Sequence, residues 1–352
     1  MTSAARRIID EDVQQILKAD LPWEQLDGRT VLISGAGGLV PAYLVHVLMS
    51  LQQAPMKLSC RVIGLVRDRA RASQRLGRWL DHPHLTLLEQ DIREPLAEGI
   101  RADMMIHAAS PASPKLFGTD PAGTLVPNVL GTWHLLERAR ATGVSRFLFV
   151  SSGEVYGQVA PERIPTAELD YGWLDPASVR SCYAESKRLA ETMCVSWQSQ
   201  YGIPTVIARP FHTYGPGLDF TDGRIFADFV GAVVERRELV LHSDGSAQRA
   251  FCYLTDAIHG LFTVLLKGAP GQAYNVGNEA GELSIRKLAE LLQGLFPDRV
   301  PGIRFQERPV SEGYLPSPIS RNCPATGKLR ALGWQPTTCP AVGFRRTVES
   351  FL

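Results

Sequence analysis

The chain has 352 residues, of which 45% are hydrophobic and 21% are charged. This composition is ordinary for a globular protein with one large domain or two closely joined ones. The formal net charge of +1 gives no general attraction to nucleic acid or to an anionic membrane. No apolar run approaches the roughly 20 residues of a membrane-spanning helix, and the N-terminus lacks the apolar core of a signal peptide.

The six cysteines form no Cys-x-x-Cys pair and have no histidine close by in the sequence. This spacing argues against a zinc site or a disulfide framework, so we expect no metal. Reduced thiols and the lack of an export signal predict a cytoplasmic protein.

An amphipathic helix is predicted near the N-terminus, because apolar residues recur at helical spacing over residues 8–18. We expect residues 1–27 to form a helical extension that packs on the body of the protein.

A glycine-rich turn follows the first predicted strand, Thr30–Ser34, and leads into a helix that extends to about Gln53. Strand, turn and helix in this order indicate a dinucleotide site, because glycines let the backbone approach a pyrophosphate at the helix N-terminus. Pro41 stands where a third small residue is usual, which a helix tolerates in its first turn. The predicted cofactor contacts are Gly35, Gly37, Gly38 and Leu39.

The second predicted strand, Arg61–Val66, ends at a position that commonly carries an acidic residue for the adenosine ribose. Here the chain has Arg67, followed by Asp68. An arginine at this place suits a 2′-phosphate, which favours NADP over NAD.

Further strands are predicted over residues 85–89, 103–107 and 146–152, with a helix over about 122–142. The alternation of strands and helices predicts an α/β fold with a right-handed, doubly wound parallel sheet, the Rossmann fold, over residues 28–210. We expect residues 211–352 to form a smaller mixed α/β lobe that binds a nucleotide sugar and is partly interleaved with the first domain.

Additional cofactor contacts are expected after these strands, where parallel sheets bind ligands. Asp91 and Ile92 stand where an adenine edge is often bound, and a loop of small residues follows the strand over 103–107. The remaining predicted contacts are Ala108, Ala109 and Ser110 in that loop and Asn128 on the next helix.

Tyr183 and Lys187 are four residues apart and would share one face of a helix. A free tyrosine is a poor base near neutral pH, since its pKa is about 10. A lysine ammonium one turn away favours the phenolate, and a serine hydroxyl can relay a proton. Ser152 ends an apolar strand and would present its hydroxyl at the ligand-binding edge. The pattern alone is also common on solvated helix faces.

Arginines in the last third of the chain are candidates for binding a diphosphate or a carboxylate, given the fork geometry of the guanidinium. Arg249 lies in an otherwise apolar segment, whereas Arg308 and Arg321 lie in proline-rich loops. Surface ion pairs are the alternative for each, and Arg249 is the first choice for a functional role.

Together these segments resemble the extended short-chain dehydrogenase/reductase family of nucleotide-sugar epimerases, dehydratases and decarboxylases. Within it the chain looks most like the UDP-glucuronate decarboxylases. The resemblance covers the chain from about residue 28, and its main motifs lie at residues 109–114, 154–157, 180–188 and 244–253.

The resemblance implies that Tyr183 deprotonates the 4-hydroxyl of the sugar, that Ser152 relays the proton, and that Lys187 holds the cofactor ribose and lowers the tyrosine pKa. Glu154 would orient the sugar or transfer protons, and Arg249 would contact the anionic substrate. The other implied substrate contacts are Ser113, Arg180, His212 and Arg321.

Three positions depart from the decarboxylase pattern. Gly153 stands at a position that is usually serine in the decarboxylases and aspartate in the 4,6-dehydratases. His212 stands where asparagine is usual, and Gly217 where arginine is usual. The missing aspartate argues against dehydration, and the other two changes lie near the expected nucleotide sugar.

The first hypothesis is therefore a redox-neutral, NAD-dependent enzyme that decarboxylates UDP-glucuronate to a UDP-pentose. A UDP-sugar 4-epimerase is second, a 4,6-dehydratase third, and a catalytically silent nucleotide-binding protein of this fold is a fourth. A redox-neutral cycle favours tightly held NAD, while Arg67 keeps NADP open. By resemblance we also expect a homodimer, formed by a four-helix bundle of the helices that carry Asn128 and Tyr183.

Overall fold

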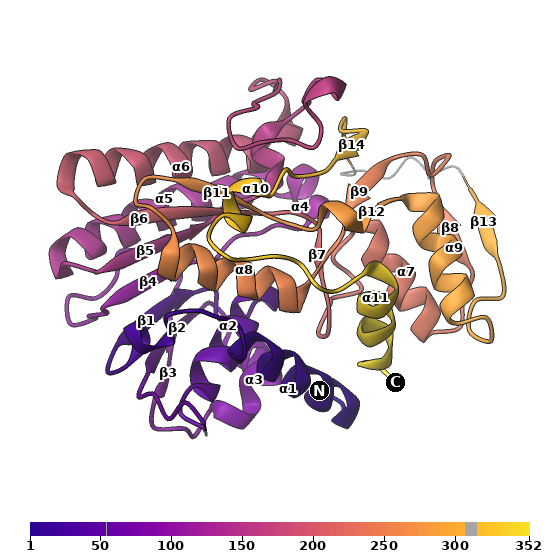
Figure 1. Cartoon of the computed structure of the whole chain (residues 1–352). Coiled ribbons are helices and arrows are strands. Elements are labelled where there is room, and N and C mark those ends of the chain that lie inside the picture. The colour runs from indigo at the N-terminus through magenta and orange to yellow at the C-terminus, as the bar shows by residue number, and fades with distance from the viewer. Residues whose placement is uncertain (54, 307–314) are drawn as a thin grey trace.

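The computed structural model describes residues 1–53, 55–306 and 315–352. Its centre is a seven-stranded parallel sheet with the strand order β11-β6-β5-β4-β1-β2-β3 (Figure 1). The strands are β1 (Thr30–Ser34), β2 (Arg61–Val66), β3 (Leu85–Glu89), β4 (Met104–His107), β5 (Arg146–Val150), β6 (Thr205–Pro210) and β11 (Ala273–Val276). The predicted doubly wound α/β fold is confirmed.

Both faces of the sheet are covered by helices, and the strands are accordingly apolar on both sides. On one face Leu32, Met105 and Phe147 pack with the helices α5 and α6; on the other, Val31 and Ile106 pack with α2 and α8. Figure 1 shows these helices on opposite sides of the sheet. The helices of this body are α2 (Leu39–Ser50), α3 (Arg69–Leu76), α4 (Pro114–Thr119), α5 (Pro121–Thr142), α6 (Cys182–Tyr201) and α8 (Leu254–Lys267).

The strand order reverses at β1, which has β2 on one side and β4 on the other. Chain segments that follow β1 and β4 therefore diverge and leave a crevice at the carboxyl ends of the strands, where open α/β sheets bind ligands. This topology places the glycine-rich turn after β1 opposite the loop after β4.

The C-terminal segment builds a second, smaller body with its own apolar core, formed mainly around Phe229, Phe251, Leu288 and Phe344. Two of its neighbours in sequence, α8 and β11, belong to the large sheet instead. The smaller body contains β7 (Thr213–Tyr214), α7 (Ile225–Val234), β8 (Leu239–Leu241), β9 (Gln248–Ala250), β10 (Cys252–Tyr253), β12 (Glu282–Ser284), α9 (Ile285–Leu295), β13 (Ile303–Phe305), β14 (Arg321–Asn322) and α11 (Pro340–Glu349). The short helix α10 (Gly327–Arg330) packs against β11 and α8 of the large body.

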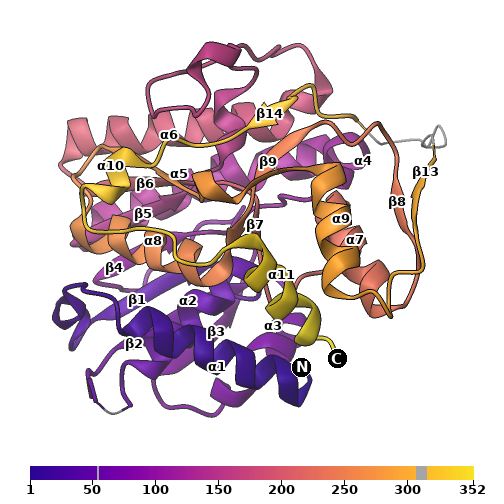
Figure 2. The ribbon, with the colours of Figure 1, turned by 45° about the vertical axis from the view of Figure 1, so that its right-hand side comes forward.

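The N-terminal helix α1 (Ser3–Leu17) lies across both bodies (Figure 2). It begins five residues earlier than its apolar periodicity indicates, because the Thr2 hydroxyl caps it by accepting from the Ala5 N–H at 2.9 Å. The buried Asp12 carboxylate accepts from Tyr253 Oη at 2.8 Å and from Arg346 Nη2 at 2.7 Å. The helix thus joins the large sheet layer to the C-terminal helix α11.

Other predicted boundaries shift by a few residues. The helix α2 ends at Ser50 rather than near Gln53, β4 begins at Met104, and β5 ends at Val150, two residues before Ser152. No helix in the described ranges is long and apolar enough to cross a bilayer. Arg308 lies outside the described residues.

Candidate active site

A cavity of about 780 Å³ opens at the carboxyl ends of the strands, between the large sheet and the smaller body. Its wall is formed by the glycine-rich turn, the loops after β2 and β4, the turn after β5, the start of α6 and the segment 210–224. Cavities of this size at a topological switch point are typical ligand sites.

The glycine-rich turn fits the close approach of a dinucleotide. Gly35 has φ +72°, and a Cβ built on it would lie 2.7 Å from Ala109 Cα. A Cβ on Gly37 would lie 3.0 Å from Ala72 Cβ. The absence of a side chain at these two glycines therefore lets the turn lie close to the loop after β4 and to the helix α3. The helix α2 begins here without a side-chain cap, which leaves its first N–H groups for an anionic ligand.

The loop after β4 is held against this turn by a buried pair of side chains. Ser34 Oγ accepts from the backbone N–H groups of Ala108 and Ala109, each at 3.1 Å, and lies 2.7 Å from His107 Nδ1. Burial lowers the pKa of His107 to about 3, so its ring is neutral. His107 is therefore a packed strand histidine that positions the loop.

Tyr183 and Lys187 lie on one face of α6 and point toward the end of β5. Lys187 Nζ donates to Val150 O at 2.8 Å and lies 5.9 Å from the centre of the Tyr183 ring. The Ser152 hydroxyl lies beside the Tyr183 phenol and favours its ionised form. All three side chains line the cavity, so the predicted catalytic group is brought together.

Burial controls the protonation of this group. Burial raises the pKa of Tyr183, and the hydrogen bond from Ser152 opposes that shift. Burial lowers the pKa of Lys187 to about 7, although the nearby Glu191 carboxylate opposes this. Desolvation is the largest influence on the pKa of Tyr183 in the protein by itself, so the lowering expected from Lys187 stays a prediction.

Glu154 and Arg180 form a second polar group beside Tyr183. Arg180 Nη2 lies 3.2 Å from Glu154 Oε2, and the guanidinium lies 4.8 Å from the centre of the Phe117 ring. Phe117 in turn stacks on the Tyr183 ring, with centroids 5.0 Å apart. Arg180 Nε is buried without a hydrogen-bond partner among the described residues, so this guanidinium retains a donor for a further anionic or polar group.

The space beside Gly153 is filled by an aromatic ring. A Cβ built on Gly153 would lie 2.9 Å from three atoms of the Phe211 ring, and Phe211 also lines the cavity. The next residue, His212, is half-buried, and desolvation together with the charge of Arg249 lowers its pKa well below its usual value. This part of the wall is therefore apolar or neutral, and it contains no carboxyl group at position 153.

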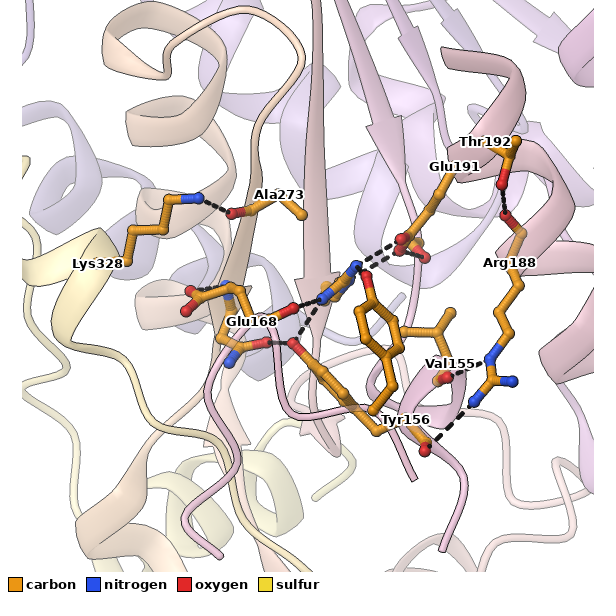
Figure 3. A network of polar contacts seen from close by, with 12 residues as sticks. Val155, Tyr156, Glu168, Arg188, Glu191, Thr192, Ala273 and Lys328 are labelled. Carbon is orange, nitrogen blue, oxygen red and sulfur yellow. Dashed lines mark hydrogen bonds and ion pairs between the residues drawn. The ribbon is translucent and has the colours of Figure 1, made fainter. Parts of the chain in front are cut away.

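A buried ion pair supports the catalytic turn from below. Arg209 Nη2 and Nε donate to Glu191 Oε2 and Oε1 at 2.6 and 2.9 Å, and Ser151 Oγ donates to Glu191 Oε1 at 2.6 Å. Arg209 Nη1 also donates to Tyr156 Oη at 2.8 Å. Figure 3 shows Tyr156, Glu168 and Glu191 in this network. The pair joins α6, β6 and the 3₁₀ turn Gly153–Tyr156, and so fixes Ser152 and Glu154 relative to Tyr183.

Most of the sequence-predicted site residues line the cavity. These are Gly35, Gly37, Gly38, Leu39, Arg67, Asp91, Ile92, Ala108, Ala109, Ser110, Ser113, Ser152, Glu154, Tyr183, Lys187 and His212. Arg180 lies behind this wall and reaches it through Glu154.

Three predicted residues lie elsewhere. Asn128 is fully buried between α5 and α6, where it donates to Ser186 Oγ at 2.9 Å. Arg249 donates to the backbone carbonyls of Ile319 and Ser320 at 2.8 and 3.1 Å, and Arg321 makes a two-point ion pair with Glu282. These contacts of Arg249 and Arg321 hold β9, β12 and β14 together, and their assignment as substrate contacts stays a prediction.

Other residues of the cavity wall were not singled out from the sequence. Arg224 lines the cavity and pairs with Asp222, and Arg75 donates to the carbonyls of Gly37 and Gly217, both at 2.8 Å. The segment Asp222–Arg224 belongs to a sequence motif, but Arg224 was not assigned to the site from the sequence. Arg75 belongs to no motif. Its contact with Gly217 joins residues 142 positions apart, so spacing along the chain could not indicate it.

Similarity to known proteins agrees with this geometry. The sequence profile described as "NAD dependent epimerase/dehydratase family" matches residues 31–277. UDP-glucuronic acid decarboxylase 5 of Arabidopsis thaliana is 34% identical over 321 residues, which are 91% of this chain and 89% of that protein. UDP-glucuronic acid decarboxylase 1 of Danio rerio is 32% identical over 325 residues, 92% of this chain and 73% of that protein.

Solved structures give the same result. A double mutant of the dTDP-glucose 4,6-dehydratase DesIV from Streptomyces venezuelae, crystallised with NAD, has a TM-score of 0.76 and 26% identity, covering 91% of this chain and 96% of that one. The UDP-glucose 4-epimerase of Thermotoga maritima has a TM-score of 0.78 and 22% identity, covering 92% and 98%, and shows the fold alone. The expected family is confirmed: the chain belongs to the NAD dependent epimerase/dehydratase family, the extended short-chain dehydrogenases/reductases.

Proposed function

We propose that the protein converts a nucleotide sugar through a 4-keto intermediate in a redox-neutral reaction, and that this reaction is the decarboxylation of UDP-glucuronate to a UDP-pentose. The observation that carries the proposal is the grouping of Tyr183, Lys187 and Ser152 in one cavity with the glycine-rich turn. The extent of similarity to UDP-glucuronic acid decarboxylases supports the choice of substrate.

The glycine-rich turn and the uncapped start of α2 would hold the pyrophosphate of a nicotinamide dinucleotide. When bound, the nicotinamide supplies the oxidant for carbon 4 and afterwards returns the same hydride. The cycle needs a tight dinucleotide site, because the cofactor is regenerated in place. A redox-neutral cycle can use a dinucleotide with or without a 2′-phosphate.

Tyr183 would take the proton of the 4-hydroxyl, since its phenol lies in the cavity wall beside the Ser152 hydroxyl. Lys187 lies one turn away, and its ammonium group would stabilise the phenolate once a negatively charged ligand has offset the desolvation of the lysine. Ser152 would carry the proton onward.

Loss of CO₂ needs little from the protein once carbon 4 is a ketone, because the β-keto acid has its electron sink built in. What the protein must supply is orientation of the carboxylate. Arg180 lies behind the wall, 3.2 Å from Glu154, and its buried Nε has no partner among the described residues, so it is the candidate to reach this carboxylate past Glu154.

The wall at Gly153 argues against dehydration. Expulsion of a 6-hydroxyl needs an acid near carbon 6, and the Phe211 ring fills the place where a side chain at 153 would lie. The same apolar wall suits a 4-epimerase, which requires no chemistry at carbon 6. Epimerisation of a UDP-sugar is therefore the second candidate.

Assembly and location are further parts of the proposal. The outer faces of α5 and α6 carry exposed apolar side chains, among them Leu130, Trp133, Leu189 and Val195. Pairing of these two helices with the same helices of a second copy would cover them in a four-helix bundle, so we propose a homodimer. The free thiols of the described cysteines suit a reducing compartment such as the cytoplasm.

The test is mass spectrometry of purified protein incubated with UDP-glucuronate and, in separate reactions, NAD or NADP. A product lighter by CO₂ is expected in at least one reaction, and Tyr201→Phe, at the exposed end of α6, serves as a control that keeps activity. An isomer of unchanged mass, separated by chromatography, would establish the epimerase instead. If UDP-glucuronate and UDP-glucose are both unchanged while a dinucleotide binds, the proposed substrates are wrong.

A further inference from the structure

The N-terminal helix α1 has a carboxylate in the middle of its apolar face. Ile9, Val13 and Ile16 of this face belong to the core of the large body, and Asp12 lies among them, 1% exposed. An apolar side chain would attach the helix at least as well, because a buried ion pair adds little net stability once its charges have lost their water. The burial of Asp12 therefore indicates a role other than attachment of the helix.

The partners of Asp12 come from both bodies of the protein. Tyr43 Oη, on the helix α2 that follows the glycine-rich turn, donates to Asp12 Oδ2 at 3.1 Å. From the smaller body, Tyr253 Oη donates to the same oxygen at 2.8 Å, and Arg346 Nη2 donates to Oδ1 at 2.7 Å. Burial raises the pKa of Asp12, and the charge of Arg346 opposes this shift. One carboxylate is thus bonded both to α2 and to α11.

Arg346 extends the connection between α1 and α11, which lie side by side (Figure 2). Its guanidinium also donates to Glu11 Oε2 at 2.9 Å and to the carbonyl oxygen of Ile8 at 3.2 Å. Asp12 and Arg346 both lie outside residues 31–277, the part of the chain that the family profile matches. The match to the family therefore does not account for this connection.

The contacts of α11 and β10 lead to the cavity wall. Phe344, two residues before Arg346, stacks on Tyr214 with ring centroids 3.9 Å apart. Tyr253 is paired with the same tyrosine in the parallel strands β10 and β7. The strand β7 is followed by the segment 215–224, which contributes several residues to the cavity wall. A displacement of α11 would therefore move this wall relative to the glycine-rich turn.

We propose that Asp12 and Arg346 form a clasp that sets the position of the smaller body over the cavity, and that Asp12 is a positioning residue for the nucleotide sugar. A dinucleotide held by the turn after β1 and the loop after β4 contacts mainly the large body. A nucleotide sugar that reaches Tyr183 from the smaller body contacts both bodies, so its affinity depends on their relative position. The inference rests on the proposed function for the identity of this ligand.

The test compares Asp12→Asn with the wild-type protein by steady-state kinetics with UDP-glucuronate and by calorimetric titration with UDP and with NAD. The substitution keeps the size of the side chain and removes the charge that pairs with Arg346. We expect the KM for UDP-glucuronate and the Kd for UDP to rise about tenfold, because only a fraction of the molecules then has the binding position. Saturating ligand restores that position, so kcat should stay within about threefold, as should the Kd for NAD. Arg346→Met should have the same effect.

Two variants on the same helix separate positioning from stability. Asp10→Asn removes an exposed carboxylate whose partner, Arg78, lies in the large body. Ile16→Val removes one methylene group from the apolar face and lowers stability without changing the clasp. Both should leave KM and Kd unchanged. A KM that rises as much in Ile16→Val as in Asp12→Asn would mean that lost stability is the cause, and the clasp would be wrong.

Hydrogen exchange measures the clasp without any ligand. In Asp12→Asn the amides of β7 and of the segment 215–224 should exchange faster, whereas those of β1 and β4 should keep the wild-type rate. Unchanged exchange in this segment overturns the clasp but leaves the proposed function intact. If exchange responds as expected while the wild-type protein binds neither UDP nor NAD, the clasp is supported and the proposed function fails.

Discussion

The two ends of the cavity are built on different principles. At the reaction end Tyr183 is 6% exposed and Lys187 1% exposed, and Lys187 is held by a hydrogen bond to Val150 O at the end of β5. At the far end of the cavity, formed by the end of β2 and by α3, Arg67 and Arg71 are exposed, and the side chain of Arg71 is 60% accessible. Burial at the first end changes protonation states, whereas exposure at the second leaves full charges in contact with solvent.

This difference indicates how each end contributes to function. A buried group has a pKa that depends on what is bound beside it, so the reaction end is responsive to the ligand. An exposed guanidinium keeps its charge whatever is bound beside it. Substitutions at the two ends should therefore have separable effects on the reaction and on ligand binding.

The largest effect is expected from Tyr183→Phe, which removes the phenol and leaves the aromatic stacking on Phe117 in place. Turnover should fall about a hundred- to ten-thousandfold, the usual contribution of a general acid–base group, while dinucleotide affinity stays within about threefold. Steady-state kinetics with calorimetric titration measure both. Turnover within about tenfold of the Tyr201→Phe control would contradict the role of Tyr183.

A smaller effect is expected on the pH dependence of the free energy of unfolding, through Lys187. The pKa of this lysine is lowered by burial to about 7, whereas an unfolded lysine has a pKa of about 10.4. Between these values the unfolded chain binds more protons, so without added dinucleotide the free energy of unfolding gains up to about 1.4 kcal/mol per pH unit from this group as pH rises. This gain is complete near the unfolded pKa.

Urea unfolding across this pH window should therefore show a rising difference between the wild-type protein and Lys187→Met. The comparison of the two proteins cancels the titration of other groups. Lys18→Met, at an exposed position after α1, is the control and should follow the wild-type pH dependence. Parallel curves for wild type and Lys187→Met would show that Lys187 is charged and stabilised in the folded protein.

The smallest expected effect is at the glycine-rich turn. Gly35→Ala and Gly28→Ala both place a side chain at positive φ, +72° and +69°, but only the first brings a Cβ within 4 Å of another residue. The shared strain should cost each variant about 1 kcal/mol of stability. Only Gly35→Ala should also lose dinucleotide affinity, by about tenfold. Equal affinity in the two variants would mean that the turn does not hold the cofactor.

Local pattern was sufficient for much of the molecule. The strands β1 to β5 of the large sheet and the glycine-rich turn were predicted within a few residues, because hydrophobic periodicity and turn residues act over short stretches of chain. The helix that carries Tyr183 and Lys187 was predicted from their spacing, whereas the edge strand β11 was not predicted. The position of Ser152 at the end of β5 followed from the same pattern. These elements also identified the family.

The arginines could not be assigned in this way. Arg249 and Arg321 were expected at the substrate, yet their guanidinium groups bind β-strand carbonyls and Glu282, while Arg75 and Arg224 reach the cavity. A long charged side chain can reach many partners, and its choice depends on contacts between residues far apart in sequence. Periodicity contains no information about such contacts.

By itself the sequence determined the fold, the family and the Ser152, Tyr183 and Lys187 group, because these depend on local spacing and on residue type. Only the tertiary structure decided that Phe211 fills the space beside Gly153, that Asp68 is engaged as a helix cap, and that burial raises the pKa of Tyr183. Each of these depends on packing between distant segments and on exclusion of water, and neither arises until the chain has folded.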